Sequence, residues 1–130
     1  MPDISTLKGI EQKRADYAYQ CAVEGSIISK PKEYKSYVKK LPMLIKTNGL
    51  GATFAFVFSK SKDGNTYDLI YKQTAVWIKN KLPFSGDFSK FIITQNSNEY
   101  RVITNEIISL YTWLRRFAEG LIEGDDEQTP

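Results

Sequence analysis

The residue types that most enzymes use for catalysis are scarce in this chain of 130 residues. It contains no histidine and a single cysteine, Cys21. This composition removes Ser-His-Asp and Cys-His pairs, imidazole metal sites, multi-cysteine zinc sites and an internal disulfide. Carboxylates alone can bind magnesium, but five of the fifteen acidic residues lie in the last twelve positions and the others are spread singly. A metal-dependent nuclease therefore stays open only as a weak alternative.

Lysines at helical spacing are the more informative chemical signal. A second predicted helix places lysines three and four residues apart on one face, and two more flank this face around Pro42. The lysines of this row are Lys32, Lys35, Lys39, Lys40 and Lys46. A row of ammonium groups can meet a phosphate backbone without reading its sequence. The alternative reading is a solvated helix face whose lysines serve solubility.

Three arginines extend the set of candidate cations. Arg14 falls on the apolar stripe of the first predicted helix, where such a residue is usually paired, lies at a groove edge or faces a ligand. Arg115 and Arg116 come late on the last predicted helix, where cations also complement the helix dipole. A structural role and a ligand contact are both open for each of them.

The charge distribution also points to an anionic partner. The net charge of +3 combines a basic body with an acidic end, because the chain through Ala118 carries 18 basic and 10 acidic residues, a balance of +8. We predict one helical domain over residues 1–124 and a mobile acidic tail over 125–130. No apolar run is long enough to cross a bilayer and no signal peptide is evident, so we expect a cytoplasmic protein.

Helices must position these cations. The sequence predicts three helices in the first half of the chain. The second begins near Lys32 and stops at Asn48-Gly49; Pro42 predicts a kink or a restart inside it. The run from Leu50 to Ser61 is ambiguous, because its aromatic and β-branched residues favour a buried strand. No other segment offers a convincing strand partner, so we predict a buried helix.

Apolar spacing predicts the remaining helices. Thr66 is the predicted cap of one that runs to about Leu82, and Ser85 or Asp87 opens a short one that ends at Ile93. The last is the clearest, with an apolar stripe at alternating steps of four and three: Ile103, Ile107, Leu110, Leu114, Phe117 and Leu121. The prediction is an all-α, compact, single-domain bundle of five or six helices.

Three segments together resemble the small-subunit family of the Cmr (type III-B) CRISPR effector complexes. They are residues 11–19 (EQKRADYAY), residues 37–56 with the motifs YVKKLP, NGL and TFAF, and residues 113–118 (WLRRFA). Their order and spacing, and the length of the chain, look like that family. The part between Ser61 and Asn98 carries little of the resemblance. The most specific part is the Lys-Lys-x-Pro run with the Asn-Gly-Leu that follows.

The resemblance implies an all-α fold and no enzymatic activity, metal, cofactor or small-molecule substrate. In this family the small subunits stack beside larger backbone subunits along the guide and target RNA, and the cutting residues belong to other subunits. The implied partners are other Cmr subunits, copies of this chain, and RNA. Carried onto this sequence, the leading candidates for phosphate contact are Lys39, Lys40 and Lys46, followed by Arg14, Arg115 and Arg116. The rival function is a helical adaptor that binds proteins without touching nucleic acid.

Overall fold

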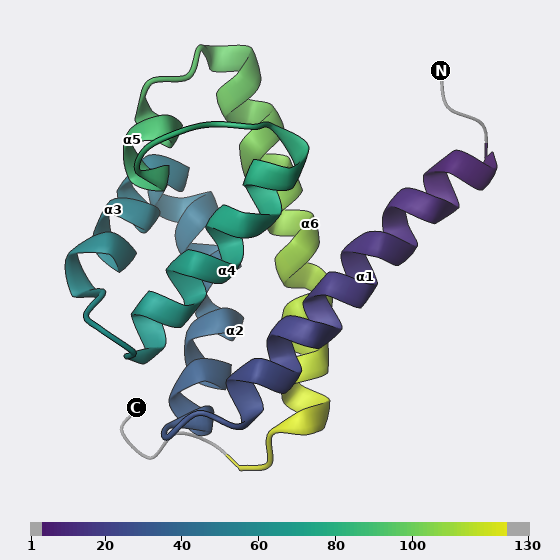
Figure 1. Ribbon diagram of the computed structural model, residues 1–130, viewed down its shortest axis with the longest axis vertical. Helices are drawn as coiled ribbons and strands as arrows, with labels where there is room; N and C mark the ends of the chain where they lie inside the picture. Colours follow the sequence, from purple (N-terminus) through teal and green to yellow (C-terminus); the bar gives the residue numbers. More distant parts are fainter. Residues whose placement is uncertain (1–3, 125–130) are drawn as a thin grey trace.

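The computed structural model describes residues 4–124, with side chains from residue 9 onward. This part of the chain forms six helices and no strand: α1 (Ile4–Ser26), α2 (Pro31–Asn48), α3 (Leu50–Lys60), α4 (Thr66–Lys81), α5 (Phe88–Ile93) and α6 (Ser97–Leu121) (Figure 1). The predicted all-α bundle is confirmed. The predicted acidic tail, residues 125–130, lies outside the described residues. None of the helices in the described part is both long and apolar enough to cross a membrane.

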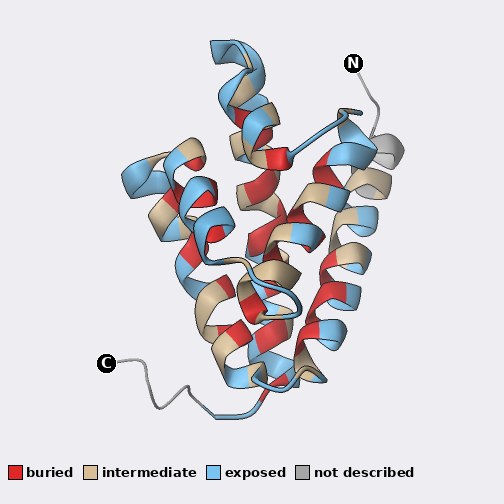
Figure 2. Cartoon of the chain, turned by 60° about the vertical axis from the view of Figure 1, so that its left-hand side comes forward, coloured by how far each residue is buried: buried red, intermediate tan, exposed pale blue. Residues whose placement is uncertain are grey.

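The last helix organises the core. α6 packs against α1, α2, α4 and α5, and its most extensive contact is with α1, the first helix of the chain. The predicted stripe of α6 is buried at Ile103, Ile107, Leu110 and Leu114, each at most 1% exposed. Burying one such side chain contributes roughly 1.5–3 kcal/mol. The last two positions of the stripe differ from the prediction, because Phe117 is only partly buried and Leu121, at the end of the helix, is 39% exposed. Figure 2 shows buried residues on the sides of the helices that face one another, with exposed residues on their outer sides.

The bounds of α2 follow from its end residues. Pro31 occupies the first turn, where its missing N–H has no helical partner to lose. Gly49 ends the helix with φ +90°, a backbone conformation that suits glycine, as the Asn-Gly pair predicts. α2 continues through Pro42 as one helix. Of the two predicted alternatives the restart is therefore wrong, and the kink stays a prediction.

The ambiguous run after Gly49 is the helix α3, as predicted, but it is not fully buried. Phe54 and Val57 are 0% exposed, whereas Phe56 is 45% and Phe58 is 52% exposed. α3 lies at the edge of the bundle in Figure 1 and packs against α2, α4 and α5. Its apolar residues surround the whole helix, but these neighbours cover only part of its circumference. Two aromatic side chains are therefore left on the surface.

Side-chain caps begin three of the helices. Asn65, Asp87 and Asn96 each accept a hydrogen bond from the backbone N–H three residues later. Such a cap typically contributes about 1 kcal/mol. Asp87 is one of the two predicted openings of α5, and this prediction is confirmed. The predicted cap at Thr66 is wrong by one residue, because Asn65 supplies the acceptor and Thr66 is already the first helical residue.

Candidate nucleic-acid interface

Two helices far apart in the sequence, α2 and α6, form the surface that carries most of the predicted cations. Near the end of α6, Glu119 Oε1 lies 3.5 Å from Lys39 Nζ on α2. Near the start of α6, the Tyr100 hydroxyl accepts a hydrogen bond of 2.7 Å from the backbone N–H of Gly51, just after α2 ends. The two helices are therefore antiparallel neighbours, and residues late on α6 lie beside the middle of α2.

This arrangement brings four of the predicted residues to one side of the molecule. Lys39 and Lys46 are seven residues apart, which places them on the same side of α2. Arg115 and Arg116 precede Glu119 by four and three residues, so they flank its position on α6, one on either side. All five side chains are exposed. We call this set, Lys39, Lys46, Arg115, Arg116 and Glu119, the α2–α6 surface.

The electrostatic balance of the α2–α6 surface favours an anion. Glu119 is its single carboxylate, and the Lys39–Glu119 pair has side chains that are 40% and 42% exposed. An exposed pair of this kind is worth about 0–1 kcal/mol, so a phosphate can displace the carboxylate at little cost. Within residues 9–124, Lys46, Arg115 and Arg116 have no ion-pair partner. Three cations are thus available together.

Lys35 departs from the predicted row. It is 7% exposed, and its ammonium group donates a hydrogen bond of 3.0 Å to the backbone carbonyl of Ile122, just after α6. The prediction that Lys35 lies on an exposed face is therefore wrong. The spacing of lysines gives their angle around α2, but it does not reveal that the end of α6 covers this position.

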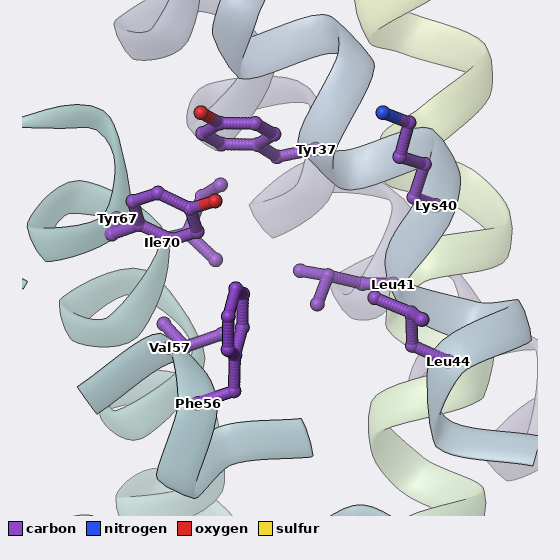
Figure 3. A pocket seen from close by; sticks show the side chains of 8 residues that line it. All are labelled: Tyr37, Lys40, Leu41, Leu44, Phe56, Val57, Tyr67 and Ile70. Atoms are coloured by element: carbon purple, nitrogen blue, oxygen red, sulfur yellow. The ribbon is translucent and has the colours of Figure 1, made fainter. Parts of the chain in front are cut away.

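Lys40 is exposed but faces a different part of the molecule. Adjacent residues of a helix point about 100° apart, so Lys39 and Lys40 lie on two sides of α2. Lys40 stands at the edge of a pocket between α2, α3 and α4, beside Tyr37 and Leu44 (Figure 3). Lys39 and Lys40 are adjacent in the sequence, but they therefore cannot both contact the same ligand group.

Arg14 is held in an ion-pair network between helices. Its side chain is 11% exposed; Nη2 lies 2.9 Å from Glu106 Oε2 on α6 and Nη1 lies 2.6 Å from Glu11 Oε2. Glu106 Oε1 also accepts a hydrogen bond of 2.9 Å from Trp77 Nε1 on α4. Burial disfavours the charged guanidinium, but the hydrogen bonds and charges of Glu106 and Glu11 outweigh it and raise the pKa of Arg14. Of the alternatives that the sequence left open for Arg14, the structure shows the ion pair.

Two features of the surface were missed from the sequence. Glu119 was counted only as part of the acidic end, although its spacing of four from Arg115 indicates a shared helix side. The pocket beside Lys40 was also missed. Its signal is the run Phe54 to Phe58, which holds more large apolar residues than one face of a helix can bury.

The described residues offer neither a cluster of metal ligands nor an activated cysteine thiol. No group of three or more His, Cys, Asp or Glu residues in residues 4–124 is placed to hold a metal ion. Cys21 is buried in the core, and this burial raises the pKa of its thiol to about 12. A thiol with so high a pKa is not a nucleophile at neutral pH.

Known proteins of one family are similar to this chain in sequence and in fold. A family model described as CRISPR-associated protein (Cas_Cmr5) matches residues 10–121. The CRISPR system Cmr subunit Cmr5 of Thermus thermophilus is 27% identical over 93 residues, which cover 70% of this chain and 76% of that protein. The crystal structure of a CRISPR-associated Cmr5 family protein, also from Thermus thermophilus, matches with a TM-score of 0.72 and 26% identity, covering 87% of this chain and 96% of that one.

These matches agree with the small-subunit resemblance seen in the sequence. The family model spans most of the described chain, and the solved relative shares its helical fold. The chain therefore belongs to the Cmr5 family of CRISPR-associated proteins and is a subunit type of the Cmr (type III-B) complex.

Proposed function

We propose that this chain is a non-catalytic structural subunit that lies along the guide and target RNA of a cytoplasmic type III-B CRISPR complex and supports target RNA binding in antiviral defence. Its partners are other Cmr subunits, further copies of itself and the RNA backbone. The observation that carries the RNA contact is the α2–α6 surface, which combines four exposed cations with one carboxylate.

The composition of this surface suits a contact that does not read sequence. Lysine and arginine side chains bind phosphates whatever the base, and base pairing between guide and target already provides the specificity. Four cations give a weak contact that salt weakens further. Repetition of the subunit along one RNA multiplies such contacts, so that the assembly binds tightly although one subunit does not.

A charge-reversal experiment tests the RNA contact. The double variant Lys39→Glu/Lys46→Glu is compared with Lys62→Glu/Lys90→Glu, which makes the same change in net charge at exposed lysines outside the α2–α6 surface. Binding of the full chain to a fluorescent single-stranded RNA is measured over a range of salt concentrations. We expect Lys39→Glu/Lys46→Glu to lose affinity for RNA. The negative slope of log K against log salt should become shallower by about 1.4, since each lost phosphate contact contributes about 0.7.

The matched control decides how the result is read. Equal losses of affinity in the two double variants would mean that RNA responds only to net charge, and this would contradict a contact at the α2–α6 surface. An unchanged slope for Lys39→Glu/Lys46→Glu would contradict it as well.

One observation favours the adaptor as a second candidate function. Met43 lies on the same side of α2 as Lys39 and Lys46, four residues after the first and three before the second, and it is 70% exposed. An apolar side chain at the centre of this surface is of little use to a phosphate backbone but packs well against a protein. If the adaptor is correct, the α2–α6 surface binds another subunit and its lysines keep the chain soluble.

Reconstitution separates the two candidates. The complex is assembled with the other Cmr subunits and with RNA that carries a photoreactive nucleotide at successive positions, and crosslinked peptides of this chain are identified by mass spectrometry. RNA binding predicts crosslinks in the segments that hold Lys39, Lys46 and Arg115. The adaptor predicts full assembly without any crosslink from RNA to α2 or α6, together with loss of assembly in Met43→Asp.

A further inference from the structure

A pocket between α2, α3 and α4 is not used by the proposed RNA contact. Its walls and floor come from three helices, and it encloses about 220 Å³. The residues that line it are Tyr37, Lys40, Leu41 and Leu44 of α2, Phe56 and Val57 of α3, and Tyr67 and Ile70 of α4. Figure 3 shows these side chains arranged around a common space. We call it the α2–α3–α4 pocket.

The floor of the α2–α3–α4 pocket is firm and apolar. Leu41, Val57 and Ile70 are at most 4% exposed and belong to the core of the bundle. One wall is a stacked pair of rings, Tyr37 and Tyr67, with centroids 4.4 Å apart and an interplanar angle of 25°. Residues fixed in this way hold a preformed cavity open, so an occupant does not have to reorganise it.

The size and lining select a single apolar side chain. Pockets for drug-sized ligands measure roughly 300–1,000 Å³, and this cavity is smaller. Leucine, valine and isoleucine side chains at the floor offer no hydrogen-bond partner. The polar atoms of the lining, the hydroxyls of Tyr37 and Tyr67 and the ammonium group of Lys40, belong to the walls and rim. A nucleobase that pressed its polar edge against the floor would leave the groups of that edge unpaired, which costs about 1–3 kcal/mol per unpaired group in proteins. A leucine or phenylalanine side chain meets no such penalty.

The rim adds positive charge to this apolar cavity. Lys40 is exposed at the mouth, and its ammonium group lies at the outer end of the side chain, beyond the apolar lining (Figure 3). Lys60 Nζ lies 5.8 Å from the centroid of the Phe56 ring. None of the lining residues is acidic. A segment that places a carboxylate beside its apolar anchor is therefore complementary to both parts of the site.

We propose that the α2–α3–α4 pocket docks one apolar side chain of an acidic segment from another subunit of the complex. The anchor enters between Phe56 and the stacked tyrosines, and a neighbouring aspartate or glutamate meets Lys40 and Lys60. Buried anchors in preformed pockets supply most of the binding energy of many protein interfaces. The site is separate from the α2–α6 surface and does not depend on the RNA contact.

A photocrosslinking experiment identifies the occupant. Phe56 is replaced by p-benzoylphenylalanine, which keeps an aromatic ring at an exposed position, and the chain is assembled with the other Cmr subunits and RNA before irradiation. We expect a crosslink to a segment of another subunit that has a large apolar residue within four positions of Asp or Glu. Crosslinking to RNA, to a second copy of this chain, or to a segment without carboxylates would overturn the proposal.

Adjacent lysines provide a matched pair of variants for the second test. Lys40→Glu and Lys39→Glu make the same charge change one residue apart, and both positions are exposed, so both variants are expected to fold, as circular dichroism will check. We expect Lys40→Glu to weaken incorporation into the complex about tenfold, since it reverses a charge at a protein interface, and to lower the RNA affinity of the free chain less than Lys39→Glu does. Lys39→Glu is expected to lower RNA affinity and to retain incorporation.

The two readouts keep this proposal distinct from the RNA contact. If Lys39→Glu leaves RNA affinity unchanged while Lys40→Glu still impairs incorporation, the RNA contact fails and the docking site stands. If the two variants impair incorporation equally, or if Lys40→Glu has no effect on it, the docking site is wrong.

Discussion

Arg14 and Lys39 each pair with a glutamate of α6 from a neighbouring helix, but the two pairs differ in exposure. Arg14 Nη2 lies 2.9 Å from Glu106, and the two side chains are 11% and 18% exposed. Lys39 Nζ lies 3.5 Å from Glu119, and these side chains are 40% and 42% exposed. The covered pair, Arg14 and Glu106, is fixed in place by several hydrogen bonds. The open pair, Lys39 and Glu119, is accessible to water, which competes for the same polar groups.

The difference shows how one residue type serves two purposes in a small bundle. Glu106 accepts hydrogen bonds from both Arg14 and Trp77, so it ties α1 and α4 to α6. Removing Glu106 would leave the covered guanidinium of Arg14 with only the exposed Glu11 as its partner, and the indole N–H of Trp77 without an acceptor, which is costly. Lys39 has little to lose, because an exposed pair contributes about 0–1 kcal/mol. Stability therefore depends on the first pair, and the second is free to exchange its partner for a ligand.

The largest expected effect is on the covered pair. Glu106→Ala leaves the guanidinium of Arg14 and the indole N–H of Trp77 without their shared acceptor. We expect it to lower the free energy of unfolding by about 3 kcal/mol in urea denaturation monitored by circular dichroism. Glu119→Ala, the same change at the open pair, is expected to cost less than about 0.5 kcal/mol. Equal losses would show that the two pairs do not differ in the way their burial indicates.

Acid provides the next test, because Glu11 completes the network around Arg14. A hydrogen bond of 2.7 Å from Trp113 Nε1, together with the nearby guanidinium, holds the pKa of Glu11 below its ordinary 4.5. A carboxyl with a lowered pKa in the folded state stabilises it above the ordinary pKa, and this contribution is lost as pH falls below it. We expect Glu11→Gln to flatten the loss of stability between about pH 5 and pH 3. Trp113→Phe should flatten this loss of stability as well. A pH profile of stability that neither variant changes would argue against the hydrogen bond between Trp113 and Glu11.

A smaller effect is expected at the open pair, and it concerns RNA. Glu119→Gln removes the single carboxylate of the α2–α6 surface and keeps the size of the side chain. If this surface binds phosphate, the affinity for single-stranded RNA should rise about twofold at low salt, with the gain fading as salt screens the charges. Glu24→Gln, at an exposed glutamate of α1, is the control. A gain in the control as large as in Glu119→Gln would assign the effect to net charge alone.

The smallest expected effect is on stability at Lys39. Lys39→Ala removes only an exposed ion pair, so its free energy of unfolding should match that of the unmodified chain within about 0.5 kcal/mol. The measurement is the same urea titration, at low and at high salt. A loss of more than about 1 kcal/mol would show that Lys39 supports the fold, and the α2–α6 surface would then have to be redefined without it.

Periodicity along the sequence was a reliable guide to what one helix presents. The stripe of α6 was predicted residue by residue from Ile103 to Leu114, and these residues are buried. The helical state of α3 was harder to predict, since local propensity favoured a strand there. The lack of a strand partner and the all-α fold implied by the family resemblance together pointed to a helix. Helices pack side by side in this chain, so the regular spacing of apolar residues carries most of the information about the fold.

The candidate site was harder to predict, because it depends on which helices are neighbours. Spacing placed Lys35 and Lys39 on one face of α2, but the end of α6 covers Lys35 and leaves Lys39 open. The family resemblance grouped Lys40 with Lys39 as phosphate contacts, although α3 and α4 form a separate pocket beside Lys40. Angles around a helix follow from the sequence of that helix alone, whereas burial and pairing depend on contacts between residues distant in the chain.

The extensive contact between α1 and α6 has a consequence for how the protein folds. α1 cannot bury its inner face until α6 is present, and α6 also covers α2, α4 and α5. During synthesis the earlier helices leave the ribosome one by one with their apolar faces open. The bundle therefore closes late, in a step that joins its two most distant helices. A chain that stops before Ser97 keeps the contacts among α2, α3, α4 and α5 but leaves the inner face of α1 without its main partner, and we expect that face to be open to proteolysis.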